Sequence, residues 1–128
     1  MRTKDDIERY LALLGHDFDE VAEDTWVVHV DEDGPNIVVR YEPPLVVFRM
    51  KVMPVPEHDQ LELMKTLLEL NATEVVHGAF GLEGQNVVMT CSLQVENLDQ
   101  NEFEAAIDSM SMAVAQNRER LSAFVEKQ

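Results

Sequence analysis

The stretches Leu67–Ala72 (LLELNA) and His77–Gly84 (HGAFGLEG) decide the fold of this chain. The leucines of the first stretch continue a helical spacing that begins at Leu61 and Met64, which predicts a helix with one apolar stripe facing a core. Asn71 is expected to end this helix, because asparagine tolerates the left-handed backbone conformation. The second stretch predicts a short strand that leads into a glycine-containing turn.

The segment after the turn alternates from Val87 to Glu96, with a wholly apolar set of side chains on one side. This pattern predicts a strand with one buried face. A helix followed by such a hairpin indicates an α+β binding fold and leaves no obvious room for catalysis. The core-side residues of this strand are Val87, Met89, Cys91, Leu93 and Val95.

One helix and three strands are predicted upstream of this block. Thr3 can cap the helix, with Asp6 three residues further on, and Gly15 ends it. Only residues 25–30 of the acidic segment Asp17–Asp33 are assigned to a strand, and turn residues and prolines separate this strand from the next two. The three predicted strands are residues 25–30, 36–41 and 45–52.

Two further helices complete the prediction. The helix that contains the first stretch runs from about residue 58 to residue 70. Asp99 and Glu102 form a capping box for a final helix of roughly 25 residues, whose apolar stripe is interrupted by Asn117. Residues 1–128 are therefore predicted to form a single α+β domain of order α-β-β-β-α-β-β-α, with an antiparallel sheet and segregated helices.

The predicted sheet has apolar residues on both faces. If the Trp26 side faces the helices, the other side still carries more apolar area than solvent normally contacts, and such patches usually mark an interface. The long final helix is a second candidate for self-association, and coverage by loops and termini is the alternative. The candidate protein-binding or dimer contacts on the second face are Val27, Val38, Leu45 and Val47, with Val88 beside them.

Composition restricts the classes of partner. The formal net charge of −15 repels phosphate backbones and anionic lipid surfaces, so neither nucleic acid nor membrane is expected as a partner. Solubility alone would also favour such a charge. A single cysteine cannot form an internal disulfide, and the sequence has no secretory signal pattern and no spanning segment. A cytoplasmic location is therefore expected.

The sequence offers few candidates for chemistry. None of His16, His29, His58 and His77 stands three or four residues from another, which is the spacing that places two metal ligands on one helix face. His29 and His77 could approach across the sheet with Cys91, and these three define the enzyme alternative. Cys91 is expected to lie in the core as a small apolar group. We therefore assign no catalytic residue, metal or cofactor.

Four segments resemble a known family: the Trp26 strand, Leu67–Ala72, His77–Leu82, and Glu96–Asp99 before the last helix. Over nearly its whole length the chain resembles the type III secretion chaperone-like superfamily, and more closely its YbjN-type branch of small bacterial proteins. The resemblance implies a homodimer that holds an extended segment of a client polypeptide against apolar patches or at a sheet edge. It brings no catalytic residues with it.

The leading functional prediction is a non-enzymatic, homodimeric, chaperone-like protein of the cytoplasm that binds another polypeptide. The alternative is a regulatory or sensory module that docks on a signalling partner or binds a small ligand. An enzyme built around His29, His77 and Cys91 is the third hypothesis.

Overall fold

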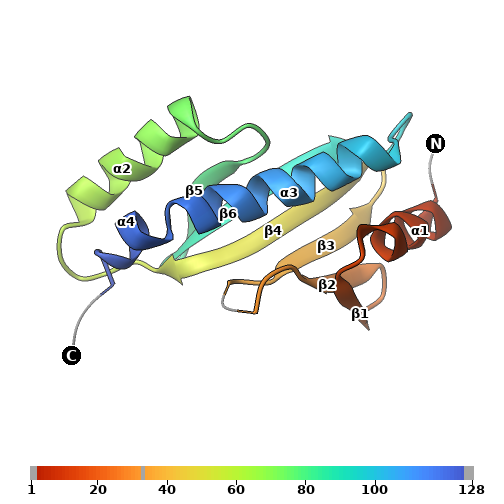
Figure 1. Ribbon diagram of the computed structural model, residues 1–128, viewed down its shortest axis with the longest axis horizontal. Coiled ribbons are helices and arrows are strands. Elements are labelled where there is room, and N and C mark those ends of the chain that lie inside the picture. Colours follow the sequence, from red (N-terminus) through yellow and green to blue (C-terminus); the bar gives the residue numbers. More distant parts are fainter. Residues whose placement is uncertain (1–2, 33, 126–128) are drawn as a thin grey trace.

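The computed structural model describes residues 3–32 and 34–125, which form a sheet with helices packed against it (Figure 1). The predicted α+β class is confirmed. The elements are α1 (Lys4–Leu14), β1 (Asp17–Ala22), β2 (Thr25–His29), β3 (Ile37–Glu42), β4 (Leu45–Pro54), α2 (Gln60–Thr73), β5 (Ala79–Glu83), β6 (Asn86–Gln94), α3 (Gln100–Gln116) and α4 (Arg118–Ser122).

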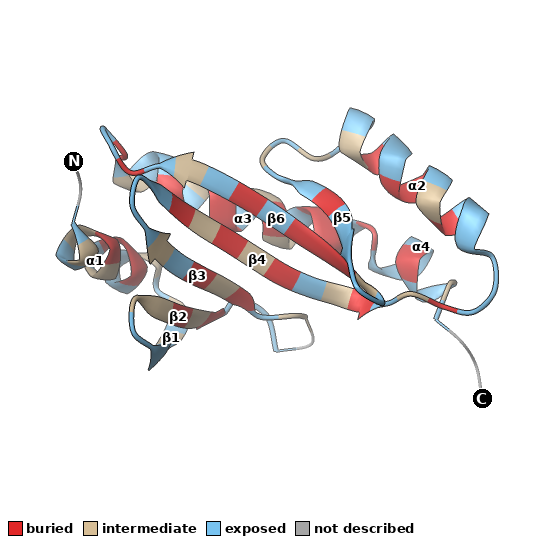
Figure 2. Ribbon diagram, turned by 180° about the vertical axis from the view of Figure 1, so that it is seen from behind, coloured by how far each residue is buried: buried red, intermediate tan, exposed pale blue. Residues whose placement is uncertain are grey.

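The six strands follow the order β1-β2-β3-β4-β6-β5, and every neighbouring pair is antiparallel. α3 crosses one face of the sheet, α1 and α4 lie on the same side, and α2 flanks the β5 edge (Figure 1). Figure 2 shows the strands from behind, in front of α1 and α3. Within residues 3–32 and 34–125, no helix lies over this second face. We call it the open face.

The covered face and the helices enclose the core. Along β4, Val46, Phe48 and Met50 are at most 1% exposed, while the residues between them point to the other side, as the period of two requires. Phe103 of α3 packs edge-on against Phe48, with ring centroids 5.2 Å apart, and tilts against Tyr10 at 5.6 Å. Such aromatic pairs contribute about 0.5–1.5 kcal/mol beyond their burial. α3 therefore joins the centre of the sheet to α1.

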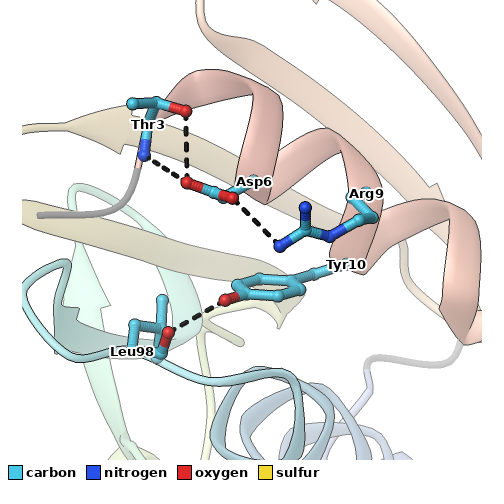
Figure 3. A network of polar contacts seen from close by, with 5 residues as sticks. All are labelled: Thr3, Asp6, Arg9, Tyr10 and Leu98. Carbon is cyan, nitrogen blue, oxygen red and sulfur yellow. Dashed lines mark hydrogen bonds and ion pairs between the residues drawn. The ribbon is translucent and has the colours of Figure 1, made fainter.

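A capping box begins α1 and a left-handed glycine ends it, as predicted. The Asp6 carboxylate accepts hydrogen bonds from the backbone N–H and the hydroxyl of Thr3, at 2.9 and 3.2 Å (Figure 3). Gly15 ends the helix in the left-handed conformation, with φ of 81°. Between these ends, the buried Tyr10 hydroxyl donates to the Leu98 carbonyl oxygen at 2.9 Å (Figure 3). This bond attaches α1 to the connection between β6 and α3.

The sequence prediction missed β1, so the predicted order of eight elements is wrong at this point. β1 pairs with β2 along its length, with an irregularity between Glu20 and Ala22. Its side chains are exposed except for the half-buried Phe18. A strand with one inward apolar side chain shows no alternating pattern, because backbone hydrogen bonds to β2 rather than side-chain burial hold it in place.

The final helix is divided in two, where the prediction had one continuous helix. Its capping box is confirmed, because the Glu102 backbone N–H donates to Asp99 Oδ1 at 2.8 Å. The break falls at Asn117, which is 6% exposed and donates through Nδ2 to the Ala113 carbonyl oxygen at 2.8 Å. An asparagine side chain that bonds to a carbonyl one turn back competes with the helical ladder. α3 therefore stops and α4 restarts.

Asn71 does not end α2, which continues to Thr73. Its side-chain amide instead bonds to both backbone groups of Phe80: Oδ1 accepts from the N–H at 2.7 Å, and Nδ2 donates to the carbonyl oxygen at 3.1 Å. The amide thus imitates a neighbouring strand for β5, which has β6 on its other side. This pair of bonds couples α2 to the sheet edge.

Candidate functional site

The open face presents both apolar and basic side chains. These positions alternate with the buried core residues along each strand, so they share the face away from α3. Apart from Val88, all are exposed or half-buried. The residues at the centre of this face are Val27 of β2, Val38 and Arg40 of β3, Leu45, Val47, Arg49 and Lys51 of β4, and Val88, Thr90 and Ser92 of β6.

The register brings the four predicted contact residues onto three adjacent strands. Val27 stands directly opposite Val38 across β2 and β3. Val47 is the diagonal neighbour of Val38 across β3 and β4. Leu45 lies two residues before Val47, at the start of β4. The three valines are half-buried and Leu45 is 37% exposed. The four residues therefore form an accessible cluster, and their role in binding stays a prediction.

Val88 differs from the other apolar residues of this face because it is 5% exposed. In the register it lies between Lys51 of β4 and Gly81 of β5. It therefore contributes little accessible area, contrary to the prediction.

The basic residues of the open face were not recognised as part of a site in the sequence. Arg40 stands opposite Val47, and Arg49 stands opposite Val38, so two valines and two arginines form a checkerboard on β3 and β4. Lys51 extends the basic side of β4. Alternation alone places Arg49 and Lys51 on this face. The checkerboard depends on how β3 pairs with β4, which is a tertiary feature.

Each arginine of the checkerboard has a carboxylate neighbour. Arg40 Nε lies 3.7 Å from Glu42 Oε1, and Arg49 forms an ion pair with Glu83 of β5. All four side chains are between 39 and 61% exposed. Ion pairs this open to water contribute about 0–1 kcal/mol each, so an incoming group can replace either carboxylate at small cost.

α2 carries a second apolar surface, which corrects the prediction of a single stripe. Leu63 and Leu67 face the core at 0 and 4% exposure, whereas Leu61 and Leu68 point outward at 72 and 68%. Leu82 of the adjacent β5 is also 55% exposed. A helix that is apolar on two sides is normally covered on both. We call Leu61, Leu68 and Leu82 the α2 surface.

The three residues of the enzyme hypothesis are not brought together. His29 lies on β2, with Nδ1 3.1 Å from Asn36 Oδ1, whereas His77 precedes β5, and β3, β4 and β6 separate these two strands. Cys91 is 8% exposed in the core, as predicted, and burial raises the pKa of its thiol. A thiol with a raised pKa holds its proton and is a poor nucleophile at neutral pH. In the described part of the chain, no three His, Cys, Asp or Glu side chains cluster to hold a metal ion.

The comparison with protein families decides the classification of the chain. The family model described as CesT_Tir_1 matches residues 1–127, almost the full length. The chain belongs to the CesT_Tir_1 family. A comparison with curated proteins found no match to this family member.

Solved structures share the fold of this CesT_Tir_1 protein. YbjN from E. coli superposes with a TM-score of 0.72 at 17% identity, covering 94% of each chain. A chain of the heterodimeric ExoU–SpcU complex from the type III secretion system of Pseudomonas aeruginosa gives 0.68 at 17% identity, covering 94% of this chain and 98% of its own. The Yersinia pestis type III secretion chaperone SycH, in complex with a fragment of YscM2, matches with a TM-score of 0.63 at 14% identity, covering 88% of this chain and 97% of that one. The resemblance to type III secretion chaperones and to YbjN is confirmed at the level of fold.

Among the described residues of this CesT_Tir_1 protein, no helix has the length and apolar character needed to cross a bilayer.

Proposed function

We propose that this protein is a non-enzymatic, chaperone-like homodimer that binds an extended segment of another polypeptide on its open face. The observation that carries the proposal is the uncovered side of the sheet, where Val27, Val38, Leu45 and Val47 form an accessible cluster (Figure 2). Each of the three valines is already half-buried. Covering its remaining apolar area would contribute about 25 cal/mol per Å² to the free energy of binding. Contacts of this size add up only when a partner covers several of them together.

An extended segment suits this surface better than a globular partner does. Same-face side chains on a strand repeat every 6.6–6.8 Å or so, and an extended client has the same repeat, so its alternate side chains can follow one strand of the sheet. Among the described residues, no strand pairs with the outer edge of β1, which offers backbone groups for further strand addition.

Complexes of the same fold support a polypeptide client. The matching structures include the HopA1–SchA chaperone–effector complex, at a TM-score of 0.63, and SycH with a fragment of YscM2. In those complexes the partner named is a protein. At sequence identities of 11 and 14%, these matches support a shared fold. The uncovered apolar surface is the reason to propose a shared function as well.

The α2 surface supports the homodimer. Leu61 and Leu68 are two turns apart on the outward side of α2, and Leu82 of β5 is exposed as well. Leucines on the same side of a helix are unfavourable when they are exposed to water, and such a patch usually marks an interface. A second copy, packed α2 to α2 about a twofold axis, would cover the same residues on both subunits. This leaves the open face available to the client.

The test is capture from native cell extract with the immobilised protein, followed by limited proteolysis of the bound partner. We expect one stoichiometric polypeptide, protected along a segment without regular structure. Val38→Lys/Val47→Lys should abolish capture, whereas Leu13→Lys on the exposed side of α1 should not. Val38→Thr/Val47→Thr, which keeps the β-branched shape, should weaken capture without disturbing the sheet. Equal capture by wild type and all variants would refute the open face as the binding site.

A regulatory module is the second candidate, and the match to YbjN favours it, because that protein is described as a candidate transcription regulator. The same capture experiment separates the two functions. A single stoichiometric client indicates the chaperone, while several partners in substoichiometric amounts indicate the regulator.

A further inference from the structure

The open face concentrates basic residues on an acidic molecule. The chain has 10 lysines and arginines against 25 aspartates and glutamates. Arg40, Arg49 and Lys51 nevertheless lie together on β3 and β4, among the apolar residues of the proposed client site. The carboxylates of this face come from its periphery. Asp17 and Asp19 lie on the edge strand β1, with Asp19 opposite Val27, while Glu42 is the last residue of β3 and Glu83 the last residue of the edge strand β5.

We propose that the client segment bound on the open face alternates aliphatic with acidic side chains. The proposal rests on the proposed function and specifies the chemistry of its partner. Val38 and Val47 occupy one diagonal of the checkerboard, and Arg40 and Arg49 the other. Any extended segment that follows β3 or β4 therefore meets a valine and then a guanidinium at successive same-face positions. Aliphatic and carboxylate side chains are the matching partners.

Arginine is suited to this exchange of partners. Its planar guanidinium has five N–H donors, and it binds a carboxylate through two parallel hydrogen bonds. Glu42 is 50% exposed and Glu83 is 61% exposed, so neither carboxylate is fixed by burial. A client carboxylate can replace or join them, and the contact becomes stronger as the client excludes water from the face. Lys51, which has no ion pair with a described residue, offers a further cation.

The overall negative charge opposes an acidic client at long range, but the local contacts decide the outcome. The Debye length is about 8 Å at physiological ionic strength, so charges beyond the face are largely screened once the segment is bound. A basic segment would instead place lysines against Arg40, Arg49 and Lys51. Like charges juxtaposed in a contact are the usual means by which an interface rejects a partner.

Three synthetic peptides of equal length test the inference: one alternates valine with glutamate, one valine with lysine, and one valine with serine. Binding is measured by fluorescence anisotropy at low and at physiological salt. We expect the valine–glutamate peptide to bind most tightly and to lose affinity as salt rises. Arg40→Gln/Arg49→Gln should weaken that peptide roughly fivefold or more. The same variant should leave the valine–serine peptide nearly unchanged.

Two controls remove charge or geometry separately. Arg9→Gln eliminates one exposed arginine on α1, away from the open face, and should not affect binding. Arg49→Lys keeps the charge but loses the bidentate geometry, and should fall between wild type and Arg49→Gln.

The outcomes separate this inference from the proposed function. Equal binding of all three peptides, or tighter binding of the valine–lysine peptide, would overturn the acidic preference while the client site stands. No binding of any peptide, together with capture from extract that is insensitive to Val38→Lys/Val47→Lys, would overturn both.

Discussion

At the scale of single residues, Asn71 and Gly78 hold β5 against the rest of the molecule. Asn71 supplies a donor and an acceptor to the Phe80 backbone on the side of β5 that β6 does not pair. Gly78, just before β5, has φ of +87°, and a Cβ there would lie 2.5 Å from the Thr90 carbonyl oxygen. We therefore expect a replacement of either residue to change the position of β5 relative to α2 and β6.

Replacing Asn71 should weaken the coupling of α2 to β5. Asn71→Ala leaves both backbone groups of Phe80 without this partner, so we expect the free energy of unfolding to fall by about 1–3 kcal/mol. Urea unfolding measures the change. Thr73→Ala is the control, because the Thr73 hydroxyl donates to the Glu69 carbonyl oxygen within its own helix. Equal losses for the two variants would show that the Asn71 contacts are unimportant.

Gly78→Ala should be destabilising and Gly81→Ala nearly neutral. The left-handed conformation alone costs an alanine about 1–2 kcal/mol, and the contact with the Thr90 carbonyl oxygen adds to this. Gly81, three residues away, has no left-handed φ, and a Cβ added there would meet no other group within 4 Å. Thermal unfolding compares the two proteins. A lowered Tm for Gly81→Ala but not for Gly78→Ala would contradict this account.

At the scale of elements, α1 is attached to the fold by its aromatic and polar contacts rather than by chain continuity alone. Tyr10 packs against Phe103 of α3 and donates to the Leu98 carbonyl oxygen (Figure 3). On the other side, Lys4 Nζ lies 2.8 Å from Glu20 of β1 and 5.8 Å from the centre of the Trp26 ring. The hydrogen bond to Glu20 is the main reason that the pKa of Lys4 is raised.

Tyr10→Phe should loosen α1 while the ring packing remains. The hydrogen bond from Tyr10 to the Leu98 carbonyl oxygen is lost, and the expected loss of stability is about 1 kcal/mol. Native-state hydrogen exchange should show faster exchange of the α1 amides, with the α2 amides unchanged as an internal control. Uniform acceleration in both helices would mean that Tyr10 acts on global stability and not on the docking of α1.

At the scale of the whole molecule, the open face and the α2 surface both leave apolar side chains accessible after the core is complete. The open face is broad, mixed with arginine and lysine, and lies on the side of the sheet opposite to α3 (Figure 2). The α2 surface consists of leucines, two of them on α2, which flanks the β5 edge and does not lie over the open face (Figure 2). The two locations are consistent with a division of roles between client binding and self-association.

Sedimentation velocity at micromolar concentration tests the assignment of the α2 surface. We expect a dimer for the wild type and a monomer for Leu61→Glu/Leu68→Glu, since each subunit of a twofold interface would bury two carboxylates. Leu13→Glu, at a similarly exposed leucine of α1, should remain dimeric. A monomeric wild-type protein would refute the homodimer.

Local patterns in the sequence determined most of the elements. The alternation of Val46, Phe48 and Met50 specified which side of β4 is buried, because successive side chains of a strand point to opposite faces. The caps at Thr3 and Asp99 located two helix starts, because the groups that satisfy a helix terminus are close in sequence.

Tertiary structure alone decided the rest. β1 exists because β2 pairs with it, and the role of Asn71 became clear only when Phe80 was placed beside it. The outward direction of Leu68 depends on where the core lies, since a helix with apolar residues on two sides does not indicate which side is covered. The checkerboard of valine and arginine depends on strand register, and register joins residues distant in sequence through contacts that no local pattern encodes.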